Sequence, residues 1–465
     1  MTGSPSFSSL GLRPELLQRV QGMNFTEMTA VQATGLPPAL AGKDVVAQAS
    51  TGSGKTAAFA LACLQRLVNT RFHVQTLVLC PTRELADQVA TSFRELAKHL
   101  PNTKVVTLCG GVAMGPQIGS LQHSAHVVVG TPGRVLKHLQ KGTLSLQGID
   151  TLVLDEADRM LDMGFADEID AILMYLPQPR QNLLFSATYT DDVAEVVEAL
   201  CPDAIHVDVT AAETAPSIAE YWCHAPALSQ HQERTQVLAS GLQRWGGKLN
   251  LVFCNTKIHC AQVSRQLSEL GCSAVALHGD MEQPDRSRTL IRFANGSANV
   301  LVATDVAARG LDIDDVDAVF NFELPHQGEV YVHRIGRTAR GGKSGVALSL
   351  VADKEMSRLR EMEAQRGGGP MRLWRDDQGA GESSLPEPEV YTLEINGGRK
   401  HKLRPGDILG ALTAGQELSA DAVGKIDIQP MVSYVAIAKA QAKIALALIN
   451  RGKIKGRQYR ARGLG

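Results

Sequence analysis

The feature that most constrains the fold is a glycine-rich octapeptide at residues 49–56, Ala-Ser-Thr-Gly-Ser-Gly-Lys-Thr. It follows a short apolar run, residues 44–49, that predicts a buried strand, and it precedes an Ala- and Leu-rich stretch, residues 57–68, that predicts a helix. A strand, a glycine-rich turn and a helix are the context of a phosphate-binding loop, because glycines let backbone N–H groups close around a phosphate. The sequence therefore predicts an α/β nucleotide-binding fold, with Ala49 in place of the usual first glycine.

The polar side chains of this loop suit a nucleoside triphosphate bound with Mg²⁺. Lys55 can reach the terminal phosphates, and the Thr56 hydroxyl can bind the metal ion. A chance Gly-Ser turn is the alternative, but a Lys-Thr pair directly after two spaced glycines argues against it. The predicted nucleotide-binding residues of the loop are Ser50, Thr51, Gly52, Ser53, Gly54, Lys55 and Thr56.

Length and composition describe an ordinary globular protein. The chain has 465 residues, which suggests about three domains. The eight cysteines form no Cys-x-x-Cys pair, and several lie in apolar runs, so we expect small core residues in a reducing compartment, the cytoplasm. No secretory signal and no transmembrane run is visible, and we expect a monomer.

The charge is unevenly distributed. The net charge is −1, yet residues 390–465 hold 13 Lys and Arg against 5 Asp and Glu. This excess of positive charge predicts an anion-binding C-terminal module, plausibly for nucleic acid.

Residues 1–205 alternate short β-like runs with helical stretches, which predicts a parallel sheet covered by helices on both faces. One run, residues 151–154, leads directly into Asp155-Glu156-Ala157-Asp158. Ligands of parallel sheets collect at the carboxyl ends of the strands. Asp155 would there hold Mg²⁺ through water, and Glu156 would orient the attacking water and accept its proton. A solvated acidic turn is the less favoured alternative.

These residues resemble the DEAD-box ATP-dependent RNA helicases, because Asp155-Glu156-Ala157-Asp158 is the signature of that family. Residues 24–32 resemble its Q motif, in which Gln32 would read the adenine edge and Phe25 would pack on the ring. The resemblance also assigns RNA-backbone contacts to three further motifs of the first half, through Arg83, Gly111, Thr131 and Arg134. Ser186-Ala187-Thr188 resembles the motif that couples hydrolysis to strand separation.

A second alternating unit lacks a phosphate loop and resembles the second RecA-like domain of this family. The resemblance implies that Arg286 and Thr304 contact RNA and that Asp305 contacts the nucleotide. It makes Arg337 and Arg340 arginine fingers. If this segment is helical, their three-residue spacing places both on one face of the helix. Ala339 stands where the family usually has glycine, and alanine would suit a helix. A solvent-facing basic helix is an equally good explanation for Arg334.

Beyond a Gly-, Ser- and Pro-rich stretch, the last segment predicts the order βαββαβ of a small RNA-recognition fold. Its aromatic residues are few, with Tyr391 in the first strand and Tyr434 in the third, so base stacking is doubtful. The basic tail gives the stronger signal, and its predicted RNA-binding residues are Lys453, Lys455 and Arg457. Within this segment, Asn396-Gly397-Gly398-Arg399-Lys400 and residues 405–411 resemble a bacterial subgroup of the same family. That resemblance implies that the domain anchors the enzyme to 23S ribosomal RNA during assembly of the large ribosomal subunit.

We therefore predict two RecA-like parallel-sheet domains, residues 1–208 and 218–365, followed by an RRM-like domain, residues 390–465. The predicted activity is RNA-dependent ATP hydrolysis with local unwinding of RNA, and the predicted cofactors are ATP and Mg²⁺. Two alternatives stay open. One is an ATP-gated clamp that holds RNA without unwinding it, and the other is a DNA helicase.

Overall fold

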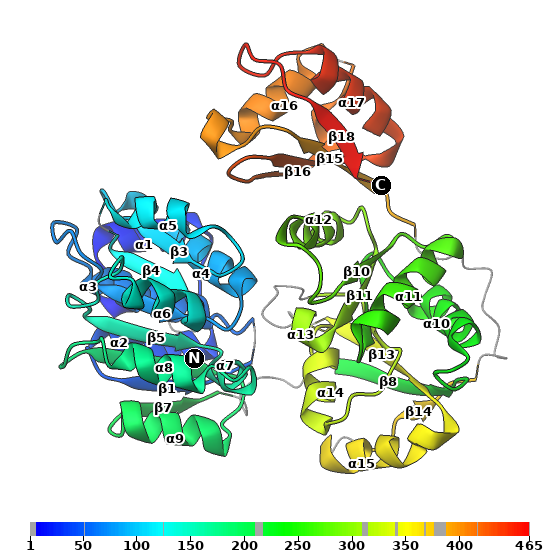
Figure 1. Ribbon diagram of the computed structural model, residues 1–465, viewed down its shortest axis with the longest axis horizontal. Coiled ribbons are helices and arrows are strands. Elements are labelled where there is room, and N and C mark those ends of the chain that lie inside the picture. Colours follow the sequence, from blue (N-terminus) through cyan, green and yellow to red (C-terminus); the bar gives the residue numbers. More distant parts are fainter. Residues whose placement is uncertain are drawn as a thin grey trace. The chain divides into compact units, whose positions relative to one another are not determined.

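The computed structural model describes residues 6–50, 52–123, 125–209, 217–308, 315–339, 343–366, 369–375, 387–415 and 417–464, without the side chains of residues 365 and 366. The chain divides into two compact units, the second of which begins at residue 216. Each unit is built on a seven-stranded sheet, and the second also carries a four-stranded sheet (Figure 1).

The sheet of the first unit has the strand order β3-β4-β2-β5-β6-β1-β7, and all of its pairs are parallel. Its strands are β1 (Val45–Gln48), β2 (Thr76–Leu79), β3 (Val105–Leu108), β4 (Val127–Gly130), β5 (Thr151–Asp155), β6 (Gln181–Ser186) and β7 (Ile205–Asp208). The predicted parallel sheet is confirmed.

Helices cover both faces of this sheet (Figure 1). Successive strand residues point to opposite faces, so Val153 packs with one helical layer, whereas Leu152 and Leu154 pack with the other. The first layer consists of α1 (Pro14–Gly22), α2 (Ala30–Leu40), α3 (Lys55–Arg66) and α4 (Arg83–Leu96). The second consists of α6 (Pro132–Gln140), α7 (Ala157–Asp162), α8 (Ala166–Leu173) and α9 (Asp191–Leu200), with α5 (Met114–Leu121) beside it.

The second unit repeats this architecture, with the strand order β10-β11-β9-β12-β13-β8-β14 and parallel pairs throughout. Its strands are β8 (Ser217–His224), β9 (Asn250–Cys254), β10 (Ala274–Leu277), β11 (Val300–Thr304), β12 (Ala318–Asn321), β13 (Ser344–Val351) and β14 (Arg372–Leu373). Its helices are α10 (His231–Trp245), α11 (Lys257–Glu269), α12 (Gln283–Ala294), α13 (Asp305–Ala308), α14 (Gly328–Ile335) and α15 (Met356–Arg366).

Strand β14 extends this sheet beyond residue 365. It pairs with β8, and the ring of Trp374 lies edge-on to Trp245, with ring centroids 4.9 Å apart. Residues 372–374 are therefore fixed on the sheet. Residues 210–216, between the two predicted RecA-like domains, and residues 367–368 and 376–386, between the second of these and the predicted RRM-like domain, lie outside the described residues.

The C-terminal segment has the predicted βαββαβ order and forms an antiparallel sheet, β16-β17-β15-β18. Its elements are β15 (Val390–Ile395), α16 (Pro405–Thr413), β16 (Val423–Ile428), β17 (Ser433–Ala438), α17 (Ala442–Arg451) and β18 (Ala461–Leu464). The sequence predicts the last strand at residues 458–461, whereas the structure has it at Ala461–Leu464. Ala461 to Leu464 are the residues that pair with β15, whereas Tyr459 packs into the core.

Polar contacts join β15 to the middle of α12 and to the turn that follows this helix. Arg288 Nε donates to Glu394 Oε2 at 2.8 Å, and Arg462 Nε donates to Glu394 Oε1 at 2.9 Å. The Ser297 and Thr392 hydroxyls lie 2.7 Å apart, and Thr392 is fully buried. One side of the small sheet is thus engaged by the preceding domain.

Candidate functional site

The phosphate loop connects β1 to α3. Gly52 and Gly54 have φ angles of 84° and 95°, in the left-handed region that favours glycine, and Gly54 is the N-cap of α3. The helix begins at Lys55, two residues earlier than the predicted stretch, so its N-terminal N–H groups and its dipole face the loop. Thr51 lies outside the described residues.

The loop lysine is folded onto its own loop. Lys55 Nζ donates to the carbonyl oxygen of Ala49 at 2.7 Å, and its side chain is buried. Ser53 Oγ similarly donates to the carbonyl oxygen of Ser50 at 2.8 Å. A triphosphate bound in the loop would have to replace the Ala49 carbonyl as the partner of this ammonium group.

Gln32 contacts the phosphate loop directly. Its Oε1 accepts the N–H of Thr29 at 3.0 Å, and its Nε2 donates to the carbonyl oxygen of Gly54 at 3.1 Å. A Cβ atom at Gly54 would lie 2.5 Å from Gln32 Nε2, so a side chain there would displace the Gln32 amide from its contact with the loop. Phe25 is half-buried and stacks on Phe7, with ring centroids 6.3 Å apart.

The acidic pair stands at the end of β5, two strands from β1. Asp155 is buried, and burial, followed by the charge of Glu156, raises the pKa of its carboxyl group to about 7, against the opposing effect of Lys55. The buried Asp155 carboxylate and the hydroxyl of Thr56, at the start of α3, are oxygen ligands of the kind that Mg²⁺ prefers, often through water. This donor set fits the predicted cofactor.

Glu156 is held in an uncommon backbone conformation, with φ 55° and ψ 55°. Its carboxylate faces Arg159, and Arg159 Nη1 lies 3.5 Å from Glu156 Oε2 without forming a hydrogen bond. The sequence interpretation missed Arg159. The signal that could have found it is the three-residue spacing between an acid and a base at the start of a helix.

Asp158 joins the acidic motif to the end of β6. Its Oδ2 accepts hydrogen bonds from the Thr188 Oγ1 at 2.8 Å, the Thr188 N–H at 2.9 Å and the Ala187 N–H at 3.2 Å. Burial acts to raise the pKa of Asp158, but these hydrogen bonds and Lys55 leave it below its usual value. The motif at residues 186–188 is thereby tied to the acids.

The strand order separates two groups of motifs along one edge of the sheet. The phosphate loop, the acids and residues 186–188 follow the neighbouring strands β1, β5 and β6. The predicted RNA-contacting residues Arg83, Gly111, Thr131 and Arg134 follow β2, β3 and β4. Because β5 pairs with β2, the nucleotide group and the RNA group adjoin each other.

Two of the RNA-group residues pack tightly together. Gly111 has a φ angle of 64°, and a Cβ atom there would lie 1.6 Å from Arg83 Nη2. Arg134 is fixed by hydrogen bonds from Nη1 to Gln117 Oε1 at 3.0 Å and from Nη2 to the Val112 carbonyl oxygen at 2.9 Å. Arg134 is therefore positioned by hydrogen bonds within the first domain.

In the second unit, Thr304 ends β11 and Asp305 begins α13. Arg334 binds both carboxylate oxygens of Asp305, at 2.6 and 2.7 Å, and also the side chain of Asn255 at 2.7 Å. Arg334 is buried, so the solvent-facing explanation for it was wrong. Arg286 lies on α12, where its Nη1 donates to the His278 carbonyl oxygen at 3.4 Å.

The segment around Arg337 is not helical. Helix α14 ends at Ile335, Thr338 forms an isolated bridge with Val316, and Ala339 has a φ angle of 60°. The expectation that Ala339 suits a helix was wrong, because it occupies the left-handed region where glycine is favoured. Arg337 is buried, and Arg340 lies outside the described residues.

The predicted basic residues of the C-terminal domain lie in the turn between α17 and β18. Lys453, Lys455 and Arg457 are exposed, and Lys455 also has a structural contact, with its Nζ 3.1 Å from Asp407 Oδ2 on α16. Tyr434 is buried, and burial, followed by the charge of Glu394, raises its pKa to about 12. Tyr434 is thus not an open stacking surface.

Comparison with known proteins agrees with this geometry. Family models match along the chain: DEAD/DEAH box helicase at residues 29–196, helicase conserved C-terminal domain at residues 233–342 and DbpA RNA binding domain at residues 392–462. The ATP-dependent RNA helicase DbpA of Escherichia coli is 48% identical over 459 residues, which cover 98% of this chain and 99% of that protein.

The chain belongs to the DEAD-box family of ATP-dependent RNA helicases.

Two further relatives support this. The DbpA of Bacillus subtilis is 34% identical over 98% of both chains. The solved structure of S. cerevisiae Dbp5 bound to RNA and ADP BeF3 is 33% identical, covers 80% of this chain and 96% of that chain, and superposes with a TM-score of 0.72. This DEAD-box helicase therefore has two RecA-like domains and a DbpA-type RNA-binding domain, uses ATP and acts on RNA. In the described part of the chain, no helix has the length and apolar character needed to cross a bilayer.

Proposed function

We propose that this helicase separates short RNA duplexes locally. Its two RecA-like domains, residues 1–208 and 218–365, together bind ATP and RNA, and its C-terminal domain, residues 390–465, anchors the enzyme to its RNA target. The observation that carries the proposal is the adjacency of the two motif groups along one sheet edge, where β5 with its acids pairs with β2. A structural change caused by ATP binding or hydrolysis at the end of β5 can then be transmitted to the RNA-contacting residues through the neighbouring strand β2.

In the proposed ATP site, Lys55 binds the terminal phosphates and Thr56 and Asp155 hold Mg²⁺. Glu156 orients the attacking water and accepts its proton, a role for which a carboxylate is suited. Phe25 packs on the adenine ring, and Gln32, whose amide both donates and accepts, reads its edge. Gln32 would exchange its Gly54 contact for the base, which couples nucleotide binding to the loop.

The second domain supplies the residues that complete the reaction. Asp305 contacts the nucleotide, and Arg337 and Arg340 stabilise the charge that develops on the γ-phosphate. On the RNA side, Arg83, Gly111, Thr131 and Arg134 of the first domain bind the backbone of the strand, together with Arg286 and Thr304 of the second. Small and basic groups at strand ends suit phosphate and ribose.

The C-terminal domain anchors the enzyme to 23S ribosomal RNA in precursors of the large ribosomal subunit, as its match to a DbpA-type domain supports. Its exposed turn with Lys453, Lys455 and Arg457 contacts the RNA. The face of the sheet that carries Glu394 is less available, because Arg288 of α12 binds Glu394 there. We propose a monomeric, cytoplasmic enzyme, a location that its eight buried free cysteines support.

The decisive experiment combines a catalytic variant with strand displacement. Glu156→Gln should keep ATP and RNA binding but stop turnover, because an amide cannot accept the proton from water. Wild-type protein should displace a strand from a short RNA duplex in the presence of ATP and Mg²⁺, and RNA should stimulate its ATPase more than DNA of the same sequence does.

Three outcomes would count against the proposal. Tight ATP-dependent RNA binding without strand displacement would favour the clamp, and equal stimulation by DNA would favour a DNA helicase. A Glu156→Gln protein with the wild-type ATPase rate would remove Glu156 from the mechanism.

A further inference from the structure

Arg134 is held by residues that precede it in the chain rather than by its own helix, α6. Its guanidinium group donates to Gln117 on α5 and to the carbonyl oxygen of Val112, which follows the Gly110–Gly111 turn. One arginine thus joins three segments of the first domain. Its direction depends on whether Gln117 is itself fixed.

Gln117 is buried, and its amide is used on both sides. Its Nε2 donates to the Cys109 carbonyl oxygen at 2.9 Å, whereas its Oε1 accepts from Arg134 at 3.0 Å and lies 3.0 Å from His138 Nε2. A carbonyl oxygen can only accept, so the NH₂ group must face Cys109. The amide oxygen must therefore face Arg134 and His138.

This orientation determines the tautomer of His138. The imidazole is fully buried, and burial, followed by the charges of Arg134 and Lys141, lowers its pKa, so the neutral ring is favoured. Because Gln117 Oε1 only accepts, the proton of the neutral ring must be on Nε2. Nδ1 is then an acceptor, and the Thr143 hydroxyl, which lies 2.8 Å from it and 3.2 Å from the His138 carbonyl oxygen, shares its single proton between these two acceptors.

The result is a relay of four side chains, Thr143, His138, Gln117 and Arg134, in which each hydrogen bond fixes the next. We propose that His138 is a positioning residue for RNA binding, which holds Arg134 in its RNA-contacting direction through Gln117. This rests on the proposed contact between Arg134 and the RNA backbone. Without His138, Gln117 Oε1 loses one of its two donors and can rotate away from the arginine.

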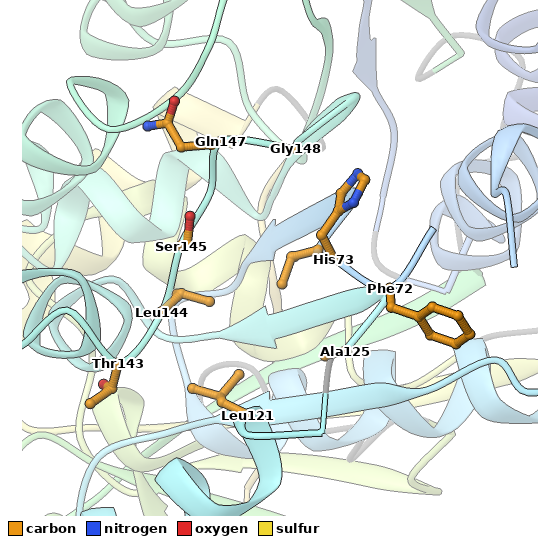
Figure 2. Close-up of a pocket in the computed structure, with 10 residues that line it drawn as sticks. Phe72, His73, Leu121, Ala125, Thr143, Leu144, Ser145, Gln147 and Gly148 are labelled. Atoms are coloured by element: carbon orange, nitrogen blue, oxygen red, sulfur yellow. The ribbon is translucent and has the colours of Figure 1, made fainter. Parts of the chain in front are cut away.

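The outer end of the relay is accessible. Thr143 lines a hollow of about 510 Å³ together with Leu121, the last residue of α5, the helix that carries Gln117 (Figure 2). Thr143 is half-buried, so it can be changed with less damage to the core than His138. Thr143→Val keeps the shape and removes the hydroxyl that donates to Nδ1.

The test measures ATPase rate against RNA concentration. His138→Leu should raise the RNA concentration for half-maximal activation on the order of fivefold, which is the cost of losing about one hydrogen bond. The RNA-free ATPase rate and the KM for ATP should stay unchanged. His138→Gln, whose amide can donate from the position of Nε2, should restore the wild-type value, and Thr143→Val should show a smaller rise.

His126 gives a matched control. It is also buried with a pKa lowered by burial, but it binds the Lys104 N–H and the Asn69 carbonyl oxygen at the other end of β4. His126→Leu should lower the melting temperature about as much as His138→Leu and leave RNA activation unchanged. An equal effect of both variants on RNA activation would reduce His138 to a core residue.

Arg134→Met separates the proposed contact between Arg134 and RNA from the proposed positioning of Arg134 by His138. If it leaves RNA activation unchanged, the assigned role of Arg134 is wrong. If it weakens RNA activation while His138→Leu and Thr143→Val do not, the relay is wrong. In the Arg134→Met background, His138→Leu should have no further effect, because the relay then has nothing to position. If His138→Leu does not fold, Thr143→Val in the two backgrounds decides the question.

Discussion

Arg159 Nη1 lies 3.5 Å from Glu156 Oε2, and both side chains are almost completely buried. Neither atom has a hydrogen-bond partner among the described residues, so their attraction is purely electrostatic. Asp155, next to Glu156, adds a second carboxyl group to the same buried region. The guanidinium group is thus the charge that compensates the proposed general base, without locking it in one direction.

Arg159→Met should therefore lower the kcat of RNA-stimulated ATP hydrolysis about tenfold, with a change in the KM for ATP below about twofold. Without this opposite charge, the buried Glu156 carboxylate would be misplaced. Steady-state kinetics at saturating RNA measure both quantities. Arg159→Lys, which keeps the charge, should retain most of the activity.

Arg180→Met is a suitable control for the loss of a partly buried arginine in the same domain, since Arg180 binds Asn182 and the Pro177 carbonyl oxygen. Turnover of Arg159→Met at the wild-type rate would mean that Glu156 needs no compensating charge.

Asp155 should make the ligand-free protein less stable as the pH rises. Its pKa in the folded state is raised to about 7, so between about pH 4 and pH 7 the folded protein binds the proton that the unfolded chain has released. The protonated Asp155 carboxyl group makes its full contribution to the free energy of unfolding below about pH 4, and this contribution is lost as the pH rises through 7. Asp155→Asn should thus melt at a higher temperature than wild type at pH 8, with a gain on the order of 4 kcal/mol, and show no gain near pH 4.

Magnesium and ATP should reverse that difference, because the ion compensates the carboxylate of the wild type but not an amide. Thermal melts at both pH values, with and without MgATP, test this. A pH-independent difference between the two proteins would show that Asp155 does not titrate in this range.

The hydrogen bond between Thr188 and Asp158 should matter more for strand separation than for ATP hydrolysis. Thr188→Val removes one of three hydrogen bonds to Asp158 Oδ2 and leaves both backbone N–H groups in place. We expect an ATPase rate within about threefold of wild type, because one hydrogen bond contributes about 1 kcal/mol, and a larger loss of strand displacement. Thr190→Val instead removes the hydroxyl that caps the N-terminus of α9, and it should change neither the ATPase rate nor the rate of strand displacement. A proportional loss of both activities would argue against a coupling role.

The sequence predicts the sheet edge well because each motif directly follows an apolar strand. Strand ends in a parallel sheet lie at one edge, so Lys55, Asp155 and Arg134 could be placed there from the order of the elements. The division of this edge into nucleotide-binding and RNA-binding halves could not be predicted from the sequence, because it depends on the insertion of β5 and β6 between β2 and β1.

Features that depend on tertiary contacts were missed. Arg334 looks like a surface residue in sequence, and only the folding of the second sheet brings Asp305 and Asn255 to it. The folded-back Lys55 depends on the loop conformation. The last strand was displaced because residues 458–461 alternate in polarity, yet the core takes Tyr459 and the pairing with β15 starts at Ala461.

Arg337→Ala should lower the kcat of ATP hydrolysis far more than it weakens ATP binding, since an arginine finger acts mainly in the transition state. We expect a loss of about a hundredfold or more in kcat with less than about threefold in nucleotide affinity. Arg360→Ala, at an exposed position on α15, is the control for the loss of one arginine in this domain. Equal losses in rate and affinity would make Arg337 a ground-state contact or a structural residue.

The last prediction concerns RNA selection by the C-terminal domain. Its exposed turn holds Lys453, Lys455 and Arg457, and Lys455 also binds Asp407. Deleting residues 390–465 should leave an ATPase that generic RNA still stimulates at high concentration, because a tethered anchor raises local RNA concentration without changing the chemistry. The deletion also exposes Arg288 by removing its partner Glu394. Charge reversals in the exposed turn avoid this side effect and test the anchor more directly.

Lys453→Glu combined with Arg457→Glu should abolish the preference for a large-subunit ribosomal RNA fragment over generic RNA, measured as the ratio of the two ATPase activation constants. Lys425→Glu with Lys443→Glu makes the same charge change on β16 and α17 and should keep that ratio. Charge alone gives salt-sensitive, sequence-blind binding, so a selective anchor must add shape or base contacts at this turn. If the truncated protein prefers the ribosomal fragment as strongly as the full chain does, selectivity resides in the two RecA-like domains and the anchor proposal is wrong.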